Sequence, residues 1–384
     1  MVNHTTDTMA IYYITFGTHP ELYDYNLQYS PAANQKSDYI IDLLDRMNKP
    51  YHVISLSRTG NKEHIWYPQK SINCGKNGTY TVWGMIGKPF KMMGGIQRII
   101  RNIQLLSFLM SCKKEDTIIV YHSLLISKTV SKAKKIIGFK LVMELEEIYQ
   151  DVVDCSKRDA KAELDVINIA DKYILSTSML EKKINPEKKR IVINGTYRVQ
   201  PKLEEPFSED KIHCVYAGTF DPTKGGLAAV DAAEFLSSDF HMHLLGFGSQ
   251  KQVDELKSRM AEVQKKTECT ISFDGLKSGE EYIRYLQKCH IGLCTQIPDA
   301  QYTETSFPSK VLVYLANGLR VLSIRIPTIT QSHIGDLLYY YDNQSPIEIA
   351  KEIEKIDCSK PYDSRSRLKE LDKRTADGFM RMID

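Results

Sequence analysis

Short apolar runs alternate with stretches of helical periodicity along most of the chain. In the first half the apolar runs have the length and composition of buried strands, and polar turns bound them. The strands expected there are residues 11–16, 51–56, 79–83, 117–121, 140–144, 172–176 and 190–193, and the helices include 34–47, 95–111 and 124–136. This alternation predicts a parallel sheet with helices on both faces.

The second half repeats the pattern after a break. Residues 200–211 carry Pro201, Pro206 and several acids without periodicity, which is typical of a linker. The strands expected beyond it are 212–217, 240–245, 270–273, 291–295, 320–324 and 338–341, and the helices are 226–236, 251–264, 279–287, 346–356 and 365–373. The chain is therefore expected to be α/β, with two Rossmann-like domains that face each other across a cleft.

Composition excludes several classes of protein. A chain of 384 residues with 42% hydrophobic and 26% charged residues suits a globular protein of two domains. The net charge of +3 is too small for general nucleic-acid binding. The eight cysteines form no Cys-x-x-Cys pair, which favours reduced core thiols over a zinc site. Residues 1–10 lack an apolar signal segment, and no run reaches the roughly 18 apolar residues of a membrane span, so we expect a cytoplasmic protein.

The segment 306–318 has the most specific local pattern. Pro308 and Ser309 are typical of a helix start, with Ser309 as the expected cap, and Gly318 ends the helix before a strand. The Ser309 hydroxyl, the Lys310 ammonium and the positive end of the helix dipole together predict an anion site. An ordinary capped helix explains the same pattern, so both interpretations stay open at this point.

A glycine-containing turn, 216–226, follows the first strand of the second half. Gly218 would let the backbone approach a ligand closely, and Lys224 precedes the next helix; a structural turn with a solvated lysine is the alternative. The segment 245–249 lacks the third glycine of a dinucleotide fingerprint, so a dinucleotide cofactor is not expected. Because two ammonium groups can neutralise a diphosphate and no Asp-x-Asp motif is present, we expect no metal and no cofactor.

Taken in order, five segments resemble the donor domain of GT-B glycosyltransferases. They are 216–226, 244–249, 271–276, 289–295 and 307–322, and 193–197 is similar to the family's turn at the end of its first domain. Among these enzymes, the segments most resemble the retaining glycosyltransferase family 4 (glycosyl transferases group 1), of the bacterial surface-polysaccharide type. The resemblance implies an acceptor-binding domain over 1–199, a nucleotide-sugar-binding domain over 212–360, and a tail over 361–384 that packs back on the first domain.

The implied activity is transfer of a hexosyl group from a nucleotide-diphosphate sugar, UDP-sugar by preference, to an acceptor hydroxyl. The acceptor class is a glycan or a lipid-linked glycan in polysaccharide or glycoconjugate synthesis. The donor-binding candidates are Gly17, Gly218, Thr219, Lys224, Leu276, Lys277, Glu304, Phe307, Ser309 and Lys310.

Two positions depart from the family's pattern. Thr219 stands where many members have an arginine, and Val313 stands where many have the second glutamate of a pair. A catalytically weak, glycosyltransferase-like binding or partner subunit therefore stays open as the alternative function.

Catalytic candidates in the first half follow two predicted strands. Glu146 and Glu147 come after 140–144, and His122 comes after 117–121. Carboxylates there would bind acceptor or sugar hydroxyls. A solvated acidic turn and a structural histidine are the alternatives, and no catalytic base is assigned.

The loop before helix 95–111 combines Lys88 and Lys91 with Met92 and Met93. Cations beside apolar side chains suit an anionic lipid surface, so we expect weak peripheral contact with the inner face of the membrane. The helix itself is expected to bury its apolar face against the sheet. That face consists of Ile96, Ile99, Ile100, Ile103, Leu106 and Met110.

Overall fold

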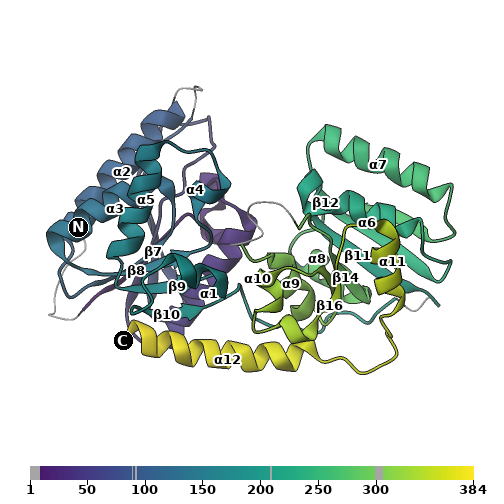
Figure 1. Ribbon diagram of the computed structural model, residues 1–384. Helices are drawn as coiled ribbons and strands as arrows, with labels where there is room; N and C mark the ends of the chain where they lie inside the picture. The colour runs from purple at the N-terminus through teal and green to yellow at the C-terminus, as the bar shows by residue number, and fades with distance from the viewer. Residues whose placement is uncertain (1–8, 89, 91–92, 208–209, 299–305) are drawn as a thin grey trace. The chain divides into compact units, whose positions relative to one another are not determined.

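The computed structural model describes residues 9–88, 90, 93–207, 210–298 and 306–384 (Figure 1). Its contacts divide the chain after Thr196 into two compact units, and Thr375–Asp384 groups with the first unit. Each unit is built on one large, mainly parallel sheet with helices, so the predicted α/β class with two Rossmann-like domains is confirmed.

The first sheet has the strand order β10-β9-β8-β7-β1-β2-β5-β4. The strands are β1 (Ile11–Thr15), β2 (Tyr51–Ser55), β4 (Lys70–Cys74), β5 (Gly78–Val82), β7 (Thr117–Tyr121), β8 (Lys140–Leu145), β9 (Lys172–Leu175) and β10 (Lys189–Val192). Every strand predicted for this half is present. The edge strand β4 was not predicted, because it is polar and pairs antiparallel with β5, so it has no continuous apolar run. A separate antiparallel pair joins β3 (Trp66–Tyr67) and β6 (Met85–Ile86).

The helices of the first unit are α1 (Pro31–Arg46), α2 (Met93–Ser111), α3 (Leu124–Ile137), α4 (Tyr149–Val152) and α5 (Lys157–Ile169), with short 3₁₀ turns η1 (Pro20–Tyr25) and η2 (Ser178–Lys183). Figure 1 shows α2, α3 and α5 side by side, and α3 packs against both of the others. Ser123 caps α3 by accepting from the N–H of Leu125, and Gly138 ends it at φ 80°. Apolar side chains of these helices and of β1, β7 and β8 form the core.

The apolar face of α2 is not buried as predicted. The buried positions of this helix are Gln97, Arg101, Leu105 and Leu109, whereas Ile99 and Ile103 are both 62% exposed. The polar pair is buried because backbone carbonyls accept from it: the Gln97 amide donates to Ile86 of β6 at 2.7 Å, and the Arg101 guanidinium donates to Ser57 at 2.9 Å. These hydrogen bonds rotate the isoleucines outward.

The second sheet is parallel throughout, with the order β13-β12-β11-β14-β15-β16. The strands are β11 (Ile212–Thr219), β12 (Phe240–Phe247), β13 (Thr270–Gly275), β14 (Ile291–Cys294), β15 (Arg320–Ile324) and β16 (Tyr339–Tyr341). The helices are α6 (Gly226–Ala233), α7 (Gln250–Gln264), α8 (Gly279–Lys288), α9 (Ser309–Ala316), α10 (Pro327–Thr330) and α11 (Pro346–Glu354), with 3₁₀ turns η3 (Pro222–Lys224) and η5 (Gly335–Leu337). All strands and helices predicted for this half form.

Residues 200–211, predicted as the linker, belong to the second unit. The backbone N–H of Gln200 donates to Ala316 at 3.1 Å, and that of Phe207 donates to Lys288 at 2.9 Å. The boundary between the units therefore lies before the predicted linker. The lack of periodicity correctly indicated an irregular segment. The sequence did not show that hydrogen bonds attach this segment to α8 and α9.

The tail is one long helix, α12 (Ser364–Ile383), which continues well beyond the predicted end at residue 373. Its last part groups with the first unit, and 361–374 group with the second. The Lys172 ammonium donates to the Met382 carbonyl, and Lys49 forms an ion pair with Asp384 at 2.6 Å. Across the described ranges, no helix is both long enough and apolar enough to cross a bilayer.

Candidate functional site

The strand order of the second sheet reverses between β11 and β14. The chain adds β12 and β13 on one side of β11, then crosses to add β14, β15 and β16 on the other. In open parallel sheets, ligands bind beyond the carboxyl ends of the strands at such a reversal. The segments that leave the sheet there are the β11–α6 turn and the residues after β14.

The β11–α6 turn is locked against the end of β14. Gly225 has φ 91°, and a Cβ at this position would lie 2.0 Å from the carbonyl oxygen of Thr295. The Thr295 hydroxyl donates to the Gly225 carbonyl at 2.7 Å, and the N–H of Ile297 donates to Thr223 at 3.0 Å. A residue with a side chain could not replace Gly225 without moving the two segments apart.

Tyr216 holds the backbone of the same turn through hydrogen bonds. Its hydroxyl donates to the carbonyl oxygens of Thr219 at 2.7 Å and Lys224 at 3.0 Å. Asp221 accepts from the N–H of Thr223 at 2.9 Å and so caps η3, which carries Lys224. The backbone around Lys224 is therefore fixed by side chains of the turn itself.

Lys310 brings a second ammonium group to this turn from the first turn of α9. Its Nζ lies 4.0 Å from the centroid of the Tyr216 ring and 3.4 Å from the Lys224 carbonyl oxygen. A Cβ on Gly218 would lie 3.2 Å from Nζ, so the glycine leaves room for the ammonium. Burial, together with repulsion from Lys224, lowers the pKa of Lys310 to about 8. The structure thus brings Gly218, Lys224 and Lys310 together.

The start of α9 differs from the prediction in one detail. Pro308 occupies the cap position, and no side-chain hydrogen bond caps the helix. Ser309 is the first helical residue and is exposed, so it is not the cap. The predicted helix start itself is confirmed, and Gly318 at φ 86° follows its end.

Three other donor-site candidates of the second unit lie in the turn after β13 or just before α9. Leu276 is exposed after β13, and Lys277 forms an ion pair with Glu281 at 2.8 Å. Phe307 is buried just before α9. Glu304 lies outside the described residues.

Gln296 was missed by sequence reasoning. It directly follows the predicted strand 291–295 and is 4% exposed. Its side-chain nitrogen is buried and has no hydrogen-bond partner in the described part of the chain. Because a buried amide donor without a partner is costly, it is a candidate to donate to a ligand oxygen at this strand end.

In the first unit, the strand order reverses between β1 and β7. Gly17 follows β1, and its carbonyl accepts from the hydroxyls of Ser55 at 2.6 Å and Ser57 at 3.0 Å. A Cβ on Gly17 would lie 2.6 Å from the side-chain oxygen of Asn34 on α1. Close packing against α1 therefore accounts for this glycine.

A buried acid–base group lies beside this reversal. The Tyr13 hydroxyl donates to Glu144 at 2.7 Å, and Lys36 forms an ion pair with Glu146 at 3.1 Å. Burial, with repulsion from Glu146, raises the pKa of Glu144 above its ordinary value of 4.5, although Lys36 opposes the shift. Lys36 and Tyr13 were not predicted, because only the tertiary structure brings α1 and β1 beside the end of β8.

His122 lies inside the first unit. Its Nε2 is 3.2 Å from Glu163 of α5, and its Nδ1 is 3.3 Å from the carbonyl oxygen of Glu147. Both side chains of the His122–Glu163 pair are fully buried. Burial lowers the pKa of His122 to about 4. This geometry suits a residue that positions the Glu147 loop better than one that exchanges protons with solvent. Glu147 itself remains partly exposed.

No protein-family model matches the chain, and no curated protein sequence matches it. Solved structures, in contrast, match it over nearly its full length. HepE from Anabaena, in complex with UDP and glucose, has a TM-score of 0.64 at 13% identity, and the match covers 98% of this chain and 97% of HepE.

Two other solved structures match similarly. The lipopolysaccharide outer core galactosyltransferase WaaB has a TM-score of 0.65 at 14% identity, covering 98% of this chain and 99% of WaaB. An α,α-trehalose-phosphate synthase (UDP-forming) from Burkholderia xenovorans, in complex with glucose-6-phosphate, has a TM-score of 0.62 at 11% identity, covering 98% and 100%. The chain therefore has the GT-B fold of these glycosyltransferases, and the predicted fold is confirmed.

Proposed function

We propose that the protein is a glycosyltransferase that moves a hexosyl group from a nucleotide-diphosphate sugar to an acceptor hydroxyl with retention. The observation that carries the proposal is the convergence of Gly218, Lys224 and Lys310 at the strand reversal of the second sheet. The shared fold supports it, since solved structures with this fold include one in complex with UDP and glucose. UDP-sugar is accordingly the proposed donor.

The two lysines suit the main electrostatic task of this reaction. The bond between the sugar and the diphosphate breaks, so negative charge grows on the departing diphosphate in the transition state. Ammonium groups held in place stabilise that charge most where water is partly excluded. Lys310 meets this condition, because its ammonium lies against the Tyr216 ring and the Lys224 carbonyl. The diphosphate in turn stabilises positive charge that develops on the sugar ring.

The remaining contacts with the donor and the acceptor are proposed from the positions of the candidate residues in the fold. The backbone around Leu276 and Lys277 would contact the base, and the Gln296 amide and Ser309 hydroxyl would donate to phosphate or sugar oxygens. Thr219 and Phe307 complete the proposed donor site among the described residues of the second unit. In the first unit, Glu146 and Glu147 would bind sugar or acceptor hydroxyls, with His122 holding the Glu147 loop.

The donor site is tested by separate Lys224→Ala and Lys310→Ala variants. Each should weaken binding of the UDP-sugar that stabilises the wild type by about 1.5–3 kcal/mol, the range for hydrogen bonds to charged groups. This loss is a factor of about 10 to 150 in Kd, measurable by titration calorimetry. Lys257→Ala is the matched control: Lys257 also lies over an aromatic ring, at 4.5 Å from the centroid of Phe273, but it belongs to α7. Unchanged affinity in both site variants, with folding intact, would place the diphosphate elsewhere.

Donor hydrolysis separates the two function classes. An active transferase should release UDP slowly from its donor without acceptor, and the release should fall in Lys310→Ala. Binding without any release, even with a range of glycan acceptors, would favour the binding or partner subunit suggested by Thr219 and Val313.

We also propose that the acceptor is lipid-linked and that α2 contacts an anionic membrane surface. Ile96, Ile99 and Ile103 are exposed on this helix, and Arg98 lies among them. Arg98, Ile99 and Ile103 line an open groove of about 310 Å³. Apolar side chains next to cations bind anionic lipid by insertion and charge attraction. Phe90 is also exposed, whereas Lys91 and Met92 of the predicted lipid-binding loop lie outside the described residues.

Sedimentation with vesicles tests this contact. The wild type should sediment at low salt with vesicles containing anionic phospholipid, and an Ile99→Ser, Ile103→Ser double variant should stay in the supernatant. Leu164→Ser, which changes an exposed leucine on α5, is the control and should sediment as the wild type does. Equal sedimentation of all three proteins would contradict a contact through α2.

A further inference from the structure

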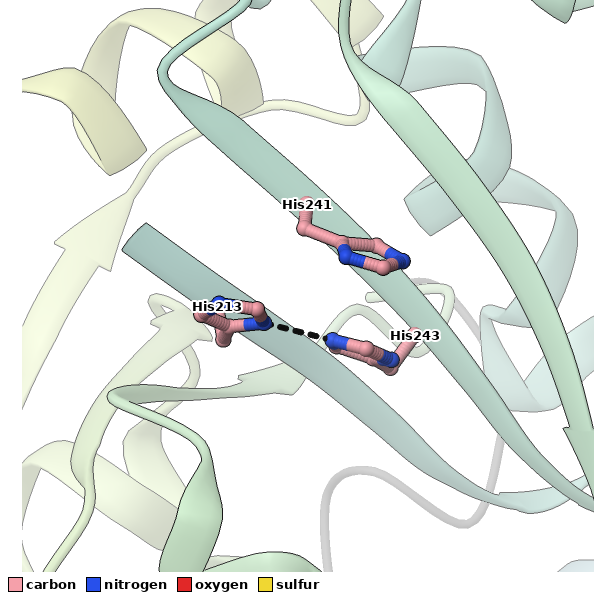
Figure 2. A group of neighbouring side chains, drawn as sticks. All are labelled: His213, His241 and His243. Carbon is pink, nitrogen blue, oxygen red and sulfur yellow. Dashed lines mark hydrogen bonds between the residues drawn. The ribbon is translucent and has the colours of Figure 1, made fainter. Parts of the chain in front are cut away.

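Three histidines gather on one face of the second sheet. His213 of β11 is paired in register with His241 of β12, and His243 lies two residues further along β12. Since side chains two residues apart on a strand point to the same face, all three project together. Figure 2 shows the three rings in this arrangement. Their potential ligand nitrogens all lie within 4.8 Å of one another.

His243 is oriented by three polar side chains near its Nδ1. The Nδ1 of His243 lies 3.2 Å from Asp274, 3.0 Å from the Ser272 hydroxyl and 2.8 Å from the Tyr285 hydroxyl. Its Nε2 faces the Nδ1 of His213 at 2.8 Å. A carboxylate that accepts from one imidazole nitrogen while the other faces a cluster of ligands is the usual outer shell of a metal-bound histidine.

The cluster is covered on one side and reachable at His241. The ring of Phe207 stacks on His213 at 4.4 Å between centroids and on His243 at 5.6 Å, which covers the group on one side. His241 remains partly exposed, so an ion has a route to the cluster.

We propose that His213, His241 and His243 bind one divalent transition-metal ion of the zinc class, with Asp274 positioning His243. Three imidazole nitrogens suit zinc, cobalt, nickel or copper better than magnesium or calcium. The ion would take the place of the proton between His213 Nδ1 and His243 Nε2, and His213 would carry that proton on its other ring nitrogen, Nε2, and stay neutral. Zinc–nitrogen bonds of about 2.0–2.1 Å in a tetrahedron hold ligand nitrogens about 3.4 Å apart, so the 2.8 Å contact must open by about 0.6 Å.

This site would be separate from the proposed diphosphate site. His213 lies near the start of β11, and Gly218 lies near its end. At about 3.3 Å per residue, five residues place them about 16 Å apart along the strand. The ion would therefore link β11 to β12 and stabilise the second unit. This structural role would be distinct from the proposed transfer reaction.

The test uses the full chain after dialysis against chelator, titrated with Zn²⁺ by calorimetry and with Co²⁺ by absorption. We expect one equivalent of Zn²⁺ to bind, a higher Tm with the ion, and the visible bands of tetrahedral Co²⁺. His241→Asn should abolish the Co²⁺ bands, and Asp274→Asn should weaken Zn²⁺ binding about 10–100-fold. His64→Asn, which changes an exposed histidine of the first unit, is the matched control and should bind as the wild type does.

Several outcomes would overturn the proposal. Absence of stoichiometric Zn²⁺ binding by the wild type would reduce the cluster to a hydrogen-bonded, stacked group, in which the His241 and His243 rings lie 3.9 Å apart. Equal Zn²⁺ affinity in the wild type and Asp274→Asn would also contradict it. If His241→Asn does not fold, the Co²⁺ spectrum of the wild type and the Asp274→Asn titration still decide. Loss of UDP-sugar binding in the chelated wild type would contradict the separation of the two sites.

Discussion

Lys310 shows how far the surroundings of one residue can alter its chemistry. In the sequence it is one lysine among many, two residues after a proline. In the structure its ammonium is enclosed by the Tyr216 ring, Gly218 and the Lys224 carbonyl. The resulting pKa of about 8 places its charge change just above neutral pH.

This pKa predicts that donor affinity depends on pH. The nucleotide-diphosphate sugar binds the ammonium form, so affinity should be constant below pH about 7.5 and fall by up to tenfold per unit above pH about 8. Calorimetric titrations from pH 6.5 to about 9.5 measure it. Lys310→Arg keeps the charge at all these pH values, so its affinity should lose this dependence.

The free energy of unfolding should rise with pH over the range in which donor affinity falls. The folded pKa lies below the ordinary value of 10.5, so the unfolded chain binds more protons between pH about 8 and 10.5. The contribution of Lys310 to the free energy of unfolding therefore rises with pH there. A donor affinity that is flat to pH 9.5 in the wild type would mean that Lys310 does not contact the diphosphate.

At the scale of elements, α2 shows that periodicity predicts a helix but does not predict which of its faces is buried. The predicted helix forms, but its buried face carries Gln97 and Arg101, and its isoleucines are exposed. Periodicity measures where apolar side chains lie on a helix, and it contains no information on which face meets the rest of the protein. The hydrogen bonds to the Ile86 and Ser57 carbonyls decide that orientation.

The β11–α6 turn provides a test at this scale. Gly225→Ala should lower the free energy of unfolding by more than the roughly 1–3 kcal/mol of left-handed backbone strain, because the new Cβ would meet the Thr295 carbonyl at 2.0 Å. Displacement of the turn should also weaken donor binding, because the same turn carries Lys224. Urea unfolding and donor titration measure the two effects.

Gly138→Ala is the control for strain alone. Gly138 also has positive φ, 80°, but the atom nearest to an added Cβ is 3.8 Å away, on the Lys114 side chain. This variant should lose stability and keep donor affinity. If the two variants lose equal stability and both keep full donor affinity, the close approach at Gly225 does not shape the donor site.

At the scale of the whole molecule, the chain forms two units, and its end returns to the first. The last part of α12 buries Phe379, Met382 and Ile383 there. Burying a side chain of this size contributes about 1.5–3 kcal/mol. Residues 375–384 are therefore a structural part of the first unit.

Deletion of 375–384 should accordingly destabilise the first unit by several kcal/mol and leave UDP-sugar binding by the second unit intact. Thermal unfolding and donor titration separate these effects. Lys49→Ala, which removes only the exposed ion pair with Asp384, should cost about 1 kcal/mol or less. A deletion that abolishes donor binding while the first unit keeps its full stability would contradict this division of roles.

Periodicity and local turn chemistry act over neighbouring residues, and they predicted most strands and helices and the two-unit α/β class. The polar edge strand β4 and the short pair of β3 and β6 were not predicted. The sequence also predicted Lys224, Lys310 and Gly218 as donor-site candidates, since all three lie in or beside segments that leave strands at their carboxyl ends. Contacts between distant segments decided the rest. The environment of Glu144 depends on Lys36 and Tyr13, and the orientation of α2 depends on backbone carbonyls of distant segments. The histidine cluster depends on the register of β11 against β12. None of these contacts has a local signal, because burial and register arise only when the sheet forms.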